Sequence, residues 1–255
     1  MDARPVAIVT GSATGVGAAT ALMLAKRGFN VVVNYTRSES DARETQRACE
    51  AEGADVLLLR GDVSKDDDCR AMAAAAVQRW GRIDALVNNA GTSVFGDDAK
   101  WDAIDAEVFN RILGVNTLGV FQMVRACLPQ LKAAQGSIVN VSSVAGALGI
   151  GSSVPYVASK GAVNSLTLHF ARQLAPEIRV NAVCPALITS RWFDQGLGPG
   201  GLQKAIAATE EHTPLRKPST PEDVADAIVW LVCGAKTVTG ELLMIDGGTH
   251  LGTRR

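Results

Sequence analysis

VAIVTGSATGVGAATALMLAKR, residues 6–27, is the stretch that decides the fold of this 255-residue chain. Val6 to Thr10 form a short, mostly β-branched run, which predicts a strand buried in a parallel sheet. A glycine turn with the spacing G-x-x-x-G-x-G follows, and an apolar-periodic helix begins at Ala18 and ends near Arg27. Together they direct backbone N–H groups and the positive end of a helix dipole at one point, so we expect a phosphate there.

Each glycine of this turn has its own expected role. Gly11 permits the tight turn, Gly15 lets the backbone approach a pyrophosphate, and Gly17 allows the helix to pack closely on the strand. A tight turn without a ligand is the alternative interpretation. The strand before the turn and the helix after it favour a dinucleotide site.

The alternation of strands and helices continues along the chain. Strands are predicted over 31–34, 56–60, 84–87, 137–141, 178–183 and 241–245, and helices over 40–52, 65–80, 101–131, 219–232 and from about 156 onward. No linker interrupts them. We therefore predict one domain over 1–255, an α/β, Rossmann-like, doubly wound parallel sheet with helices on both faces and right-handed crossovers.

The overall composition argues against several classes of protein. Apolar residues make up 47% and charged residues 20%, and a net charge of −1 offers no field that would attract nucleic acid or a membrane surface. The five cysteines lack any C-x-x-C pair and the three histidines lack ligand spacing, so we expect neither disulfides nor a metal site. The N-terminus reads as neither a signal peptide nor a membrane span, which favours a cytoplasmic protein.

GSIVNVSSVAGALGIGSSVPYVASKG, residues 136–161, carries the candidate catalytic groups. Tyr156 and Lys160 are four residues apart on a predicted helix, so their side chains share one face. An ammonium beside the phenol is expected to lower its pKa from about 10 and make it a usable acid/base at neutral pH. A flexible Gly/Ala/Ser loop is predicted between the strand at 137–141 and this helix, and Ser143 at its start is placed to donate a hydrogen bond to the same substrate oxygen. A surface packing pair is the alternative for the tyrosine and lysine.

The end of the second strand bears on the choice of dinucleotide. Asn34 stands where an acidic residue would bind a free ribose 2′-hydroxyl, and Arg37 follows it, which suits a 2′-phosphate. We therefore predict NADP rather than NAD, although Glu39 and Asp41 weaken the preference and leave NAD open. A solvated loop charge is the alternative for Arg37.

Three further polar positions are candidates. Asp62, at the end of a strand, is placed to accept a hydrogen bond from an adenine amino group, or else to cap a helix. Residues 88–91 (NNAG) put small and amide side chains where a cofactor groove would run. Asn116 lies in a helical stretch, where asparagine is a mediocre helix former, so its amide has another function or is a satisfied core amide.

Residues 189–218 form the irregular part of the sequence. Five glycines and prolines fall between 196 and 201, Trp192 and Phe193 precede them, and a short helix is predicted over 202–209. A glycine-rich, aromatic-bearing segment beside a cofactor site is typical of a substrate lid.

Seven stretches, in this order and at these separations, resemble the motifs of the short-chain dehydrogenase/reductase family. They are TGSATGVG (10–17), GDV (61–63), NNAG (88–91), NVSS (140–143), YVASK (156–160), VNAVCP (180–185) and IDGG (245–248). The chain departs from the pattern at Ala186, where relatives usually have glycine. It also has no basic residue at 12–14, where many NADP-using relatives carry one.

The resemblance implies a role for each candidate residue. Tyr156 is similar to the family's general acid/base, Lys160 to its pKa-lowering, ribose-binding lysine, and Ser143 to the serine that orients the carbonyl. Asn116 is similar to the asparagine that holds a water in the proton relay. The turn and the resemblance together predict cofactor contacts at Gly11, Ser12, Thr14, Gly15, Val16, Gly17, Arg37, Ser38, Asp62, Val63, Asn89, Ala90, Gly91, Tyr156, Lys160, Pro185, Ile188 and Thr189.

The implied reaction is hydride transfer between a nicotinamide cofactor and a ketone or secondary alcohol, with 3-oxoacyl or related carbonyl compounds among the expected substrates. No metal is required, because Tyr156 and Ser143 polarise the carbonyl. Relatives are usually homotetramers. Two alternatives stay open: a redox-inactive nucleotide-sensing or scaffolding protein on the same fold, and a cofactor-free lyase or dehalogenase.

Overall fold

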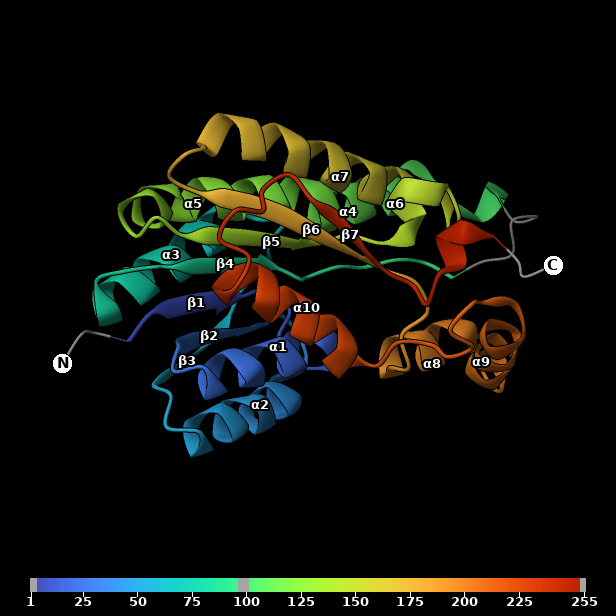
Figure 1. The fold of residues 1–255 in the computed structure, drawn as a ribbon, viewed down its shortest axis with the longest axis horizontal. Coiled ribbons are helices and arrows are strands. Elements are labelled where there is room, and N and C mark those ends of the chain that lie inside the picture. The colour runs from blue at the N-terminus through green and yellow to red at the C-terminus, as the bar shows by residue number, and fades with distance from the viewer. Residues whose placement is uncertain (1–3, 96–100, 253–255) are drawn as a thin grey trace.

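A seven-stranded parallel sheet runs through the centre of the molecule in the order β3-β2-β1-β4-β5-β6-β7 (Figure 1). The computed structural model describes residues 4–95 and 101–252. The strands are β1 (Val6–Val9), β2 (Asn30–Tyr35), β3 (Val56–Arg60), β4 (Ala85–Asn88), β5 (Ser137–Val141), β6 (Arg179–Pro185) and β7 (Leu242–Ile245). Each pairs in parallel with its neighbours, which confirms the predicted fold class.

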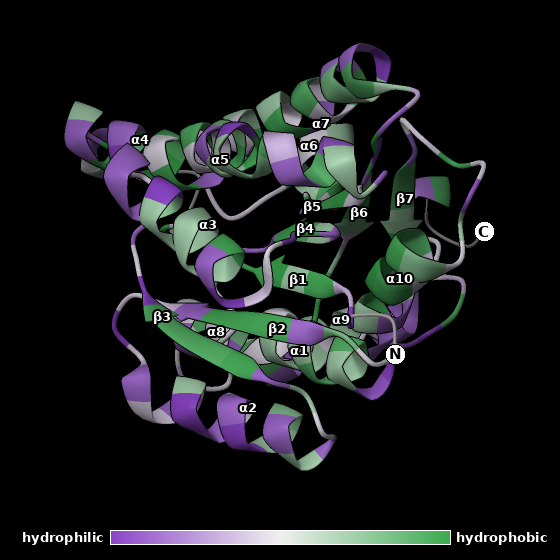
Figure 2. Cartoon of the chain, turned by 90° about the vertical axis from the view of Figure 1, so that its left-hand side faces the viewer, coloured by the Kyte–Doolittle hydropathy of each residue, from purple (hydrophilic) through white to green (hydrophobic). Residues whose placement is uncertain are grey.

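Helices cover both faces of this sheet (Figures 1 and 2). One face carries α3 (Asp66–Trp80), α4 (Ala106–Leu113), α5 (Gly119–Ala133) and α7 (Val154–Leu174), and the other carries α1 (Gly15–Lys26), α2 (Glu39–Ala51) and α10 (Pro221–Cys233). Val6 and Ile8 pack in the core under α3, α5 and α7, whereas Ala7 and Val9 pack under α1 and α10. A strand buried on both faces needs an uninterrupted apolar run, which explains the composition of β1.

The strand order changes direction between β1 and β4. From β1 the chain moves outward to β2 and β3, then returns through α3 to enter β4 on the other side of β1. The segments that leave the carboxyl ends of β1 and β4 therefore diverge, and doubly wound sheets bind ligands in the crevice at such a point. The glycine turn after β1 and the NNAG segment at the end of β4 meet there.

A short helix forms where the sequence predicted a flexible loop after β5. This helix, α6 (Val144–Leu148), begins because the Ser143 hydroxyl caps it, accepting a hydrogen bond from the Ala145 N–H at 3.1 Å. Gly149 ends it in the left-handed region, at φ 72°. The loop prediction was wrong because the glycine and alanine content hid a serine cap.

The segment predicted to be irregular also contains regular structure. Helix α8 (Arg191–Leu197) occupies its start, and α9 (Gly201–His212) extends the short helix predicted over 202–209. Figure 1 shows both helices, in orange, at the carboxyl edge of the sheet.

The long helical stretch predicted over 101–131 is interrupted. A 3₁₀ turn, Trp101–Ala103, precedes α4, and a π-helical turn, Gly114–Leu118, separates α4 from α5. By length and hydropathy alone the run Ala106–Ala133 would suffice to cross a membrane. Met123 and Leu131 of this run are fully buried in the protein core, so the core helix of a globular fold accounts for the apolar character.

Helices α6 and α7 approach each other at Gly146. A Cβ atom on Gly146 would lie 2.4 Å from the backbone of Lys160, and backbone cannot move aside as a flexible side chain can. Ser143 caps α6 and Tyr156 lies on α7, so this close contact joins the two helices that carry the candidate catalytic residues. One glycine therefore positions the two parts of the candidate catalytic group.

Gly146→Ala is expected to destabilise the protein by at least about 2 kcal/mol, because the added methyl group forces the two helices apart. Gly161→Ala is the matched control, since its added Cβ would make only an ordinary contact, 3.9 Å from the Gly146 carbonyl oxygen. Alanine is also the better helix former, so the control is expected to be neutral or stabilising. Urea unfolding measures both, and equal losses in the two variants would contradict the close approach.

Candidate active site

A cavity of about 1730 Å³ opens at the carboxyl ends of the strands. The glycine turn, the ends of β4 and β5, and helices α7, α8 and α9 contribute to its walls. Most predicted site residues line it: Gly11, Thr14, Gly15, Val16, Arg37, Asp62, Val63, Asn89, Ala90, Gly91, Ser143, Tyr156, Lys160, Pro185 and Ile188. The predicted residues that do not line it are Ser12, Gly17, Ser38, Asn116 and Thr189.

The glycine turn is shaped to receive an anion. Helix α1 begins at Gly15, its N-cap residue Thr14 makes no side-chain cap hydrogen bond, and its first turn holds no acidic residue. Gly11 and Gly15 have positive φ angles of 59° and 58°, and a Cβ atom added to Gly15 would have no neighbour within 4 Å. The first N–H groups of α1 therefore face open space without a side-chain cap, as a pyrophosphate site requires.

Two predicted contact residues support the turn instead of lining the cavity. The Ser12 hydroxyl donates to the Val9 carbonyl at 2.7 Å and accepts from the Asn34 N–H at 2.9 Å, so it points into the sheet. A Cβ atom on Gly17 would lie 2.5 Å from the Gly11 carbonyl oxygen, which shows the close packing predicted for this glycine. Both residues therefore fix the shape of the glycine turn from the side away from the cavity.

The end of β2 presents no acidic residue to the cavity. Asn34 is 1% exposed, and its Oδ1 accepts from the Gly11 N–H at 2.9 Å while its amide donates to the Gly61 carbonyl at 3.0 Å. Its side chain thereby joins the glycine turn to the end of β3. Arg37 is exposed and lines the cavity, whereas Ser38 is the N-cap residue of α2 and lies outside it.

Asp62 follows β3 and does not cap a helix, because the N-cap residue of α3 is Lys65, so the adenine contact is the prediction that stays open. It lines the cavity, and its Oδ1 accepts from the N–H and the hydroxyl of Ser64 at 3.0 and 2.7 Å. The carboxylate thus holds the turn before α3 while facing the cavity.

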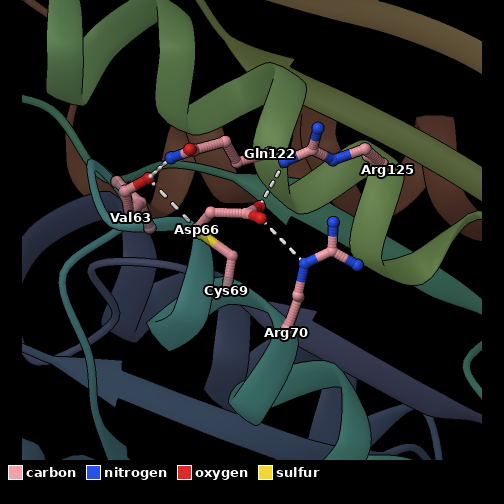
Figure 3. A network of polar contacts seen from close by, with 6 residues as sticks. All are labelled: Val63, Asp66, Cys69, Arg70, Gln122 and Arg125. Atoms are coloured by element: carbon pink, nitrogen blue, oxygen red, sulfur yellow. Dashed lines mark hydrogen bonds and ion pairs between the residues drawn. The ribbon is translucent and has the colours of Figure 1, made fainter.

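A polar network between α3 and α5 fixes the neighbouring Val63 (Figure 3). The Gln122 amide donates to the Val63 carbonyl at 2.7 Å. Beside it, Asp66 on α3 forms an ion pair with Arg70 at 2.7 Å and a second one with Arg125 on α5. These contacts join the two helices, and they hold the backbone of Val63 in place at this end of the cavity.

Tyr156 and Lys160 lie side by side on α7, as their spacing predicts. The Lys160 amino nitrogen is 5.6 Å from the centre of the Tyr156 ring and donates to the Val141 carbonyl at 2.7 Å. Ser143 faces the same cavity from the start of α6, and its hydroxyl donates to the Pro185 carbonyl at 3.3 Å. A phenol, an ammonium and a hydroxyl therefore meet in one cavity.

Burial dominates the acid–base properties of this group. It raises the pKa of Tyr156 to about 12, and a hydrogen bond with the Ser143 side chain opposes the shift. Burial also lowers the pKa of Lys160 to about 8. The shift of the phenol pKa runs opposite to the one predicted from the neighbouring ammonium, because removing a phenolate from water is the larger effect and the Ser143 hydrogen bond opposes it only in part.

Asn116 lies in the π-helical turn and is 1% exposed. Its Oδ1 accepts from the Thr92 N–H at 2.8 Å, and its amide donates to the Thr92 carbonyl and the Ser159 hydroxyl, both at 2.9 Å. It therefore ties the segment after β4 to α7 next to Lys160. Asn116 is thus a satisfied core amide, one of the two interpretations open from the sequence, and a π-turn at this place fits a functional position.

Several cavity residues have no motif that could reveal them. Phe95, Val115, Ile150 and Arg191 line the cavity, but none of them was a predicted contact residue. They lie in the connections between β4 and β5, β5 and β6, and β6 and β7, and only the strand order shows that these connections meet.

The chain has clear relatives among known proteins. The sequence profile of a family described as enoyl-(acyl carrier protein) reductase matches residues 11–250. "Granaticin polyketide synthase putative ketoacyl reductase 2" of Streptomyces violaceoruber is 42% identical over 248 residues, which cover 97% of this chain and 96% of that protein. The crystal structure of "a putative short-chain dehydrogenase/reductase from Burkholderia xenovorans" is 39% identical with a TM-score of 0.90, covering 99% of this chain and 100% of that one. The chain belongs to the short-chain dehydrogenase/reductase family.

As a short-chain dehydrogenase/reductase, it is an oxidoreductase that acts on CH–OH or ketone groups with a nicotinamide cofactor. Carveol dehydrogenase from Mycobacterium avium, solved in complex with NAD, is 27% identical with a TM-score of 0.88, covering 98% of this chain and 99% of that one. The uncapped start of α1 and the open side of Gly15 fit the pyrophosphate of such a cofactor.

The buried ammonium of Lys160 is expected to lower the stability of this short-chain dehydrogenase/reductase. A pKa lowered from 10.5 to about 8 corresponds to roughly 3 kcal/mol at neutral pH, from which the hydrogen bond to Val141 is subtracted. Lys160→Met is therefore expected to raise the free energy of unfolding by about 2 kcal/mol at pH 7 while lowering activity.

The pH dependence of this difference follows from the same shift. Above pH 10.5 the amine is neutral in both states; as the pH falls toward about 8, the unfolded chain binds the proton first, so the wild type loses stability relative to the variant. Below about pH 8 the difference is constant. Urea unfolding of both proteins across this range measures it, and parallel stability curves would contradict the lowered pKa of Lys160.

Proposed function

We propose that the protein is an NADP-preferring reductase or dehydrogenase of ketones and secondary alcohols, with Tyr156 as its proton donor and acceptor. The observation that carries this proposal is the meeting of Tyr156, Lys160 and Ser143 in one cavity with an uncapped helix N-terminus. The ketoacyl reductase among the relatives supports 3-oxoacyl or related carbonyl compounds as substrates.

When bound, the nicotinamide cofactor supplies or accepts the hydride. In the reducing direction Tyr156 hands its phenolic proton to the carbonyl oxygen while the carbonyl carbon gains the hydride. The Ser143 hydroxyl donates a hydrogen bond to the same oxygen and orients it. A phenol pKa raised to about 12 keeps the proton on Tyr156 at neutral pH, which suits its part as the donor.

Lys160 and Asn116 support the proton transfer. The Lys160 ammonium, 5.6 Å from the Tyr156 ring, stabilises the phenolate that remains after the proton has left, and its position suits the ribose hydroxyls. Asn116 holds the Thr92 segment against α7, and we assign it the relay position that returns a proton to the tyrosine through water.

Tyr156→Phe is expected to lower kcat/KM for ketone reduction by about 10²–10⁴-fold, because phenylalanine keeps the ring but has no hydroxyl proton to transfer. The dissociation constant of NADPH, measured by its fluorescence, is expected to change little. Tyr35→Phe is the control, since Tyr35 lies on β2 and does not line the cavity. Unchanged turnover by Tyr156→Phe would overturn the mechanism, and NADPH binding without reduction of any carbonyl would favour a redox-inactive nucleotide sensor.

The preference for NADP rests on charge at the ribose end of the cavity. Arg37 is exposed there, and the place of an acidic residue on β2 is taken by Asn34, whose side chain is engaged with Gly11 and Gly61. A guanidinium without a competing carboxylate from β2 favours a 2′-phosphate.

Arg37→Glu is expected to weaken NADPH binding by about tenfold or more and to leave NADH binding little changed, because only NADPH carries the phosphate. Arg47→Glu on α2 makes the same charge change on an exposed residue outside the cavity. Fluorescence titration with both cofactors measures the effect. Equal losses for NADPH and NADH would show that Arg37 does not read the phosphate.

The supporting features of the lid are at its two ends. The Thr189 N–H donates to the Ser219 carbonyl at 2.9 Å, and the Ser219 N–H donates to the Leu187 carbonyl at 3.1 Å. Residues 189–218 thus leave and rejoin the sheet edge at one point, and Arg191 on α8 reaches Asp41 on α2 at 3.0 Å. We assign this segment as the substrate lid of one domain spanning 1–255.

Assembly and location complete the proposal. Leu118, Phe121 and Leu168 are exposed apolar side chains on the α5 and α7 side of the molecule, which supports a homotetramer formed through these helices. The five cysteines are unpaired, as in a reducing cytoplasm.

A further inference from the structure

We propose that Phe95, Trp192 and Phe193 form an aromatic subsite above Tyr156 that selects ketones carrying a flat aromatic ring. This inference rests on the proposed function, because it concerns the substrate of the same site. Its three side chains come from two segments that are far apart in the sequence: the one that follows β4 and helix α8.

The rings are arranged around Trp192. Its ring centre is 4.9 Å from that of Phe95 and 4.9 Å from that of Phe193, with interplanar angles of 68° and 89°. The Tyr156 ring lies 5.9 Å away, tilted by 41°. All four residues line the cavity, so this cluster begins at the reacting phenol and continues away from it.

The position of Phe95 is set by backbone and not only by other side chains. A Cβ atom on Gly196 of α8 would lie 2.2 Å from the Phe95 ring, so the ring packs directly on the backbone of that helix. The Phe95–Phe193 pair, with centres 6.0 Å apart at 74°, adds a second contact between the two segments. The aromatic subsite is therefore packed in place beside the Tyr156 ring.

The aromatic subsite and its surroundings also leave apolar surface exposed for a ligand. Trp192 is 37% exposed, Leu197 39% and Ile150 66%, and all three line the cavity. Arg191, the charged residue next to Trp192, is paired with Asp41 on α2. The side chains nearest to the indole along α8 thus offer ring faces and apolar surface to a neutral substrate.

Ring geometry favours an aromatic substrate over a saturated one of the same size. Edge-to-face packing within the cluster leaves ring faces and edges available, and aromatic partners gain a contribution beyond buried area that an alicyclic ring does not gain. Two such contacts amount to about a tenfold difference in kcat/KM.

The test compares two bicyclic ketones, 2-tetralone and trans-2-decalone, with NADPH as the reductant. They match in size and in the position of the carbonyl, and the aromatic ring of 2-tetralone is not conjugated with its carbonyl. The wild type is expected to prefer 2-tetralone by about tenfold in kcat/KM. Trp192→Leu is expected to reduce this ratio to about two or less, mainly by loss of activity on 2-tetralone.

Trp230→Leu is the matched control, because Trp230 is an exposed tryptophan on α10 outside the cavity. It is expected to keep the wild-type ratio. A thermal-shift measurement with 2-naphthol and trans-2-decalol gives a readout other than turnover: only 2-naphthol is expected to raise Tm, and the effect is expected to vanish in Trp192→Leu. Phe193→Leu replaces Trp192→Leu if the latter fails to fold.

The outcomes separate this inference from the function on which it rests. Equal rates on both ketones, or a ratio that Trp192→Leu leaves unchanged, would overturn the aromatic subsite while the reductase proposal stands. Reduction of other ketones but of neither bicyclic one would have the same meaning. Failure to reduce any carbonyl compound, with NADPH still bound, would overturn both.

Discussion

The segments that follow β1 and β4 diverge at the carboxyl edge of the sheet, and this divergence is the constraint on which the rest of the structure depends. Beyond that edge the two segments no longer pair as strands, so their buried polar groups need other partners. The Thr10 hydroxyl accepts from the N–H groups of Asn89 and Ala90, both at 3.0 Å, and the Asn89 amide donates to the Thr10 and Gly11 carbonyls, both at 2.9 Å. These contacts hold the glycine turn open at the start of α1.

The carboxyl edge of the sheet also sets the environment of the two residues proposed for proton transfer, because Lys160 is buried there and Tyr156 is partly buried. Burial keeps the phenol of Tyr156 protonated and brings the pKa of Lys160 close to neutrality, yet a pKa of about 8 leaves the amine mostly charged at pH 7. A protonated phenol and a cation thus line one cavity, at the expense of a buried charge. This is the usual conflict between stability and activity, located here in a single side chain.

The parts of the site that could be predicted are those set by local spacing. Tyr156 and Lys160 share a face because a helix repeats every 3.6 residues, and Gly11 and Gly15 can adopt positive φ without strain. The side-chain direction of Ser12 could not be predicted, because it depends on the carbonyl of Val9 and the N–H of Asn34 across the sheet. Helix α6 was missed for a different reason: its cap at Ser143 is local, but a serine among glycines and alanines also fits a loop.

The sequence by itself determined the order of strands and helices, the doubly wound class, the cradle at the start of α1 and the family. The first three follow from periodicity and from glycines whose effect is confined to a few neighbouring residues, and the family follows from the resemblance of seven motifs. Only the tertiary structure decided the direction of the Tyr156 pKa shift and the aromatic wall of Phe95, Trp192 and Phe193. Desolvation and ring packing depend on which distant segments meet, and the strand order, not local spacing, brings those segments together.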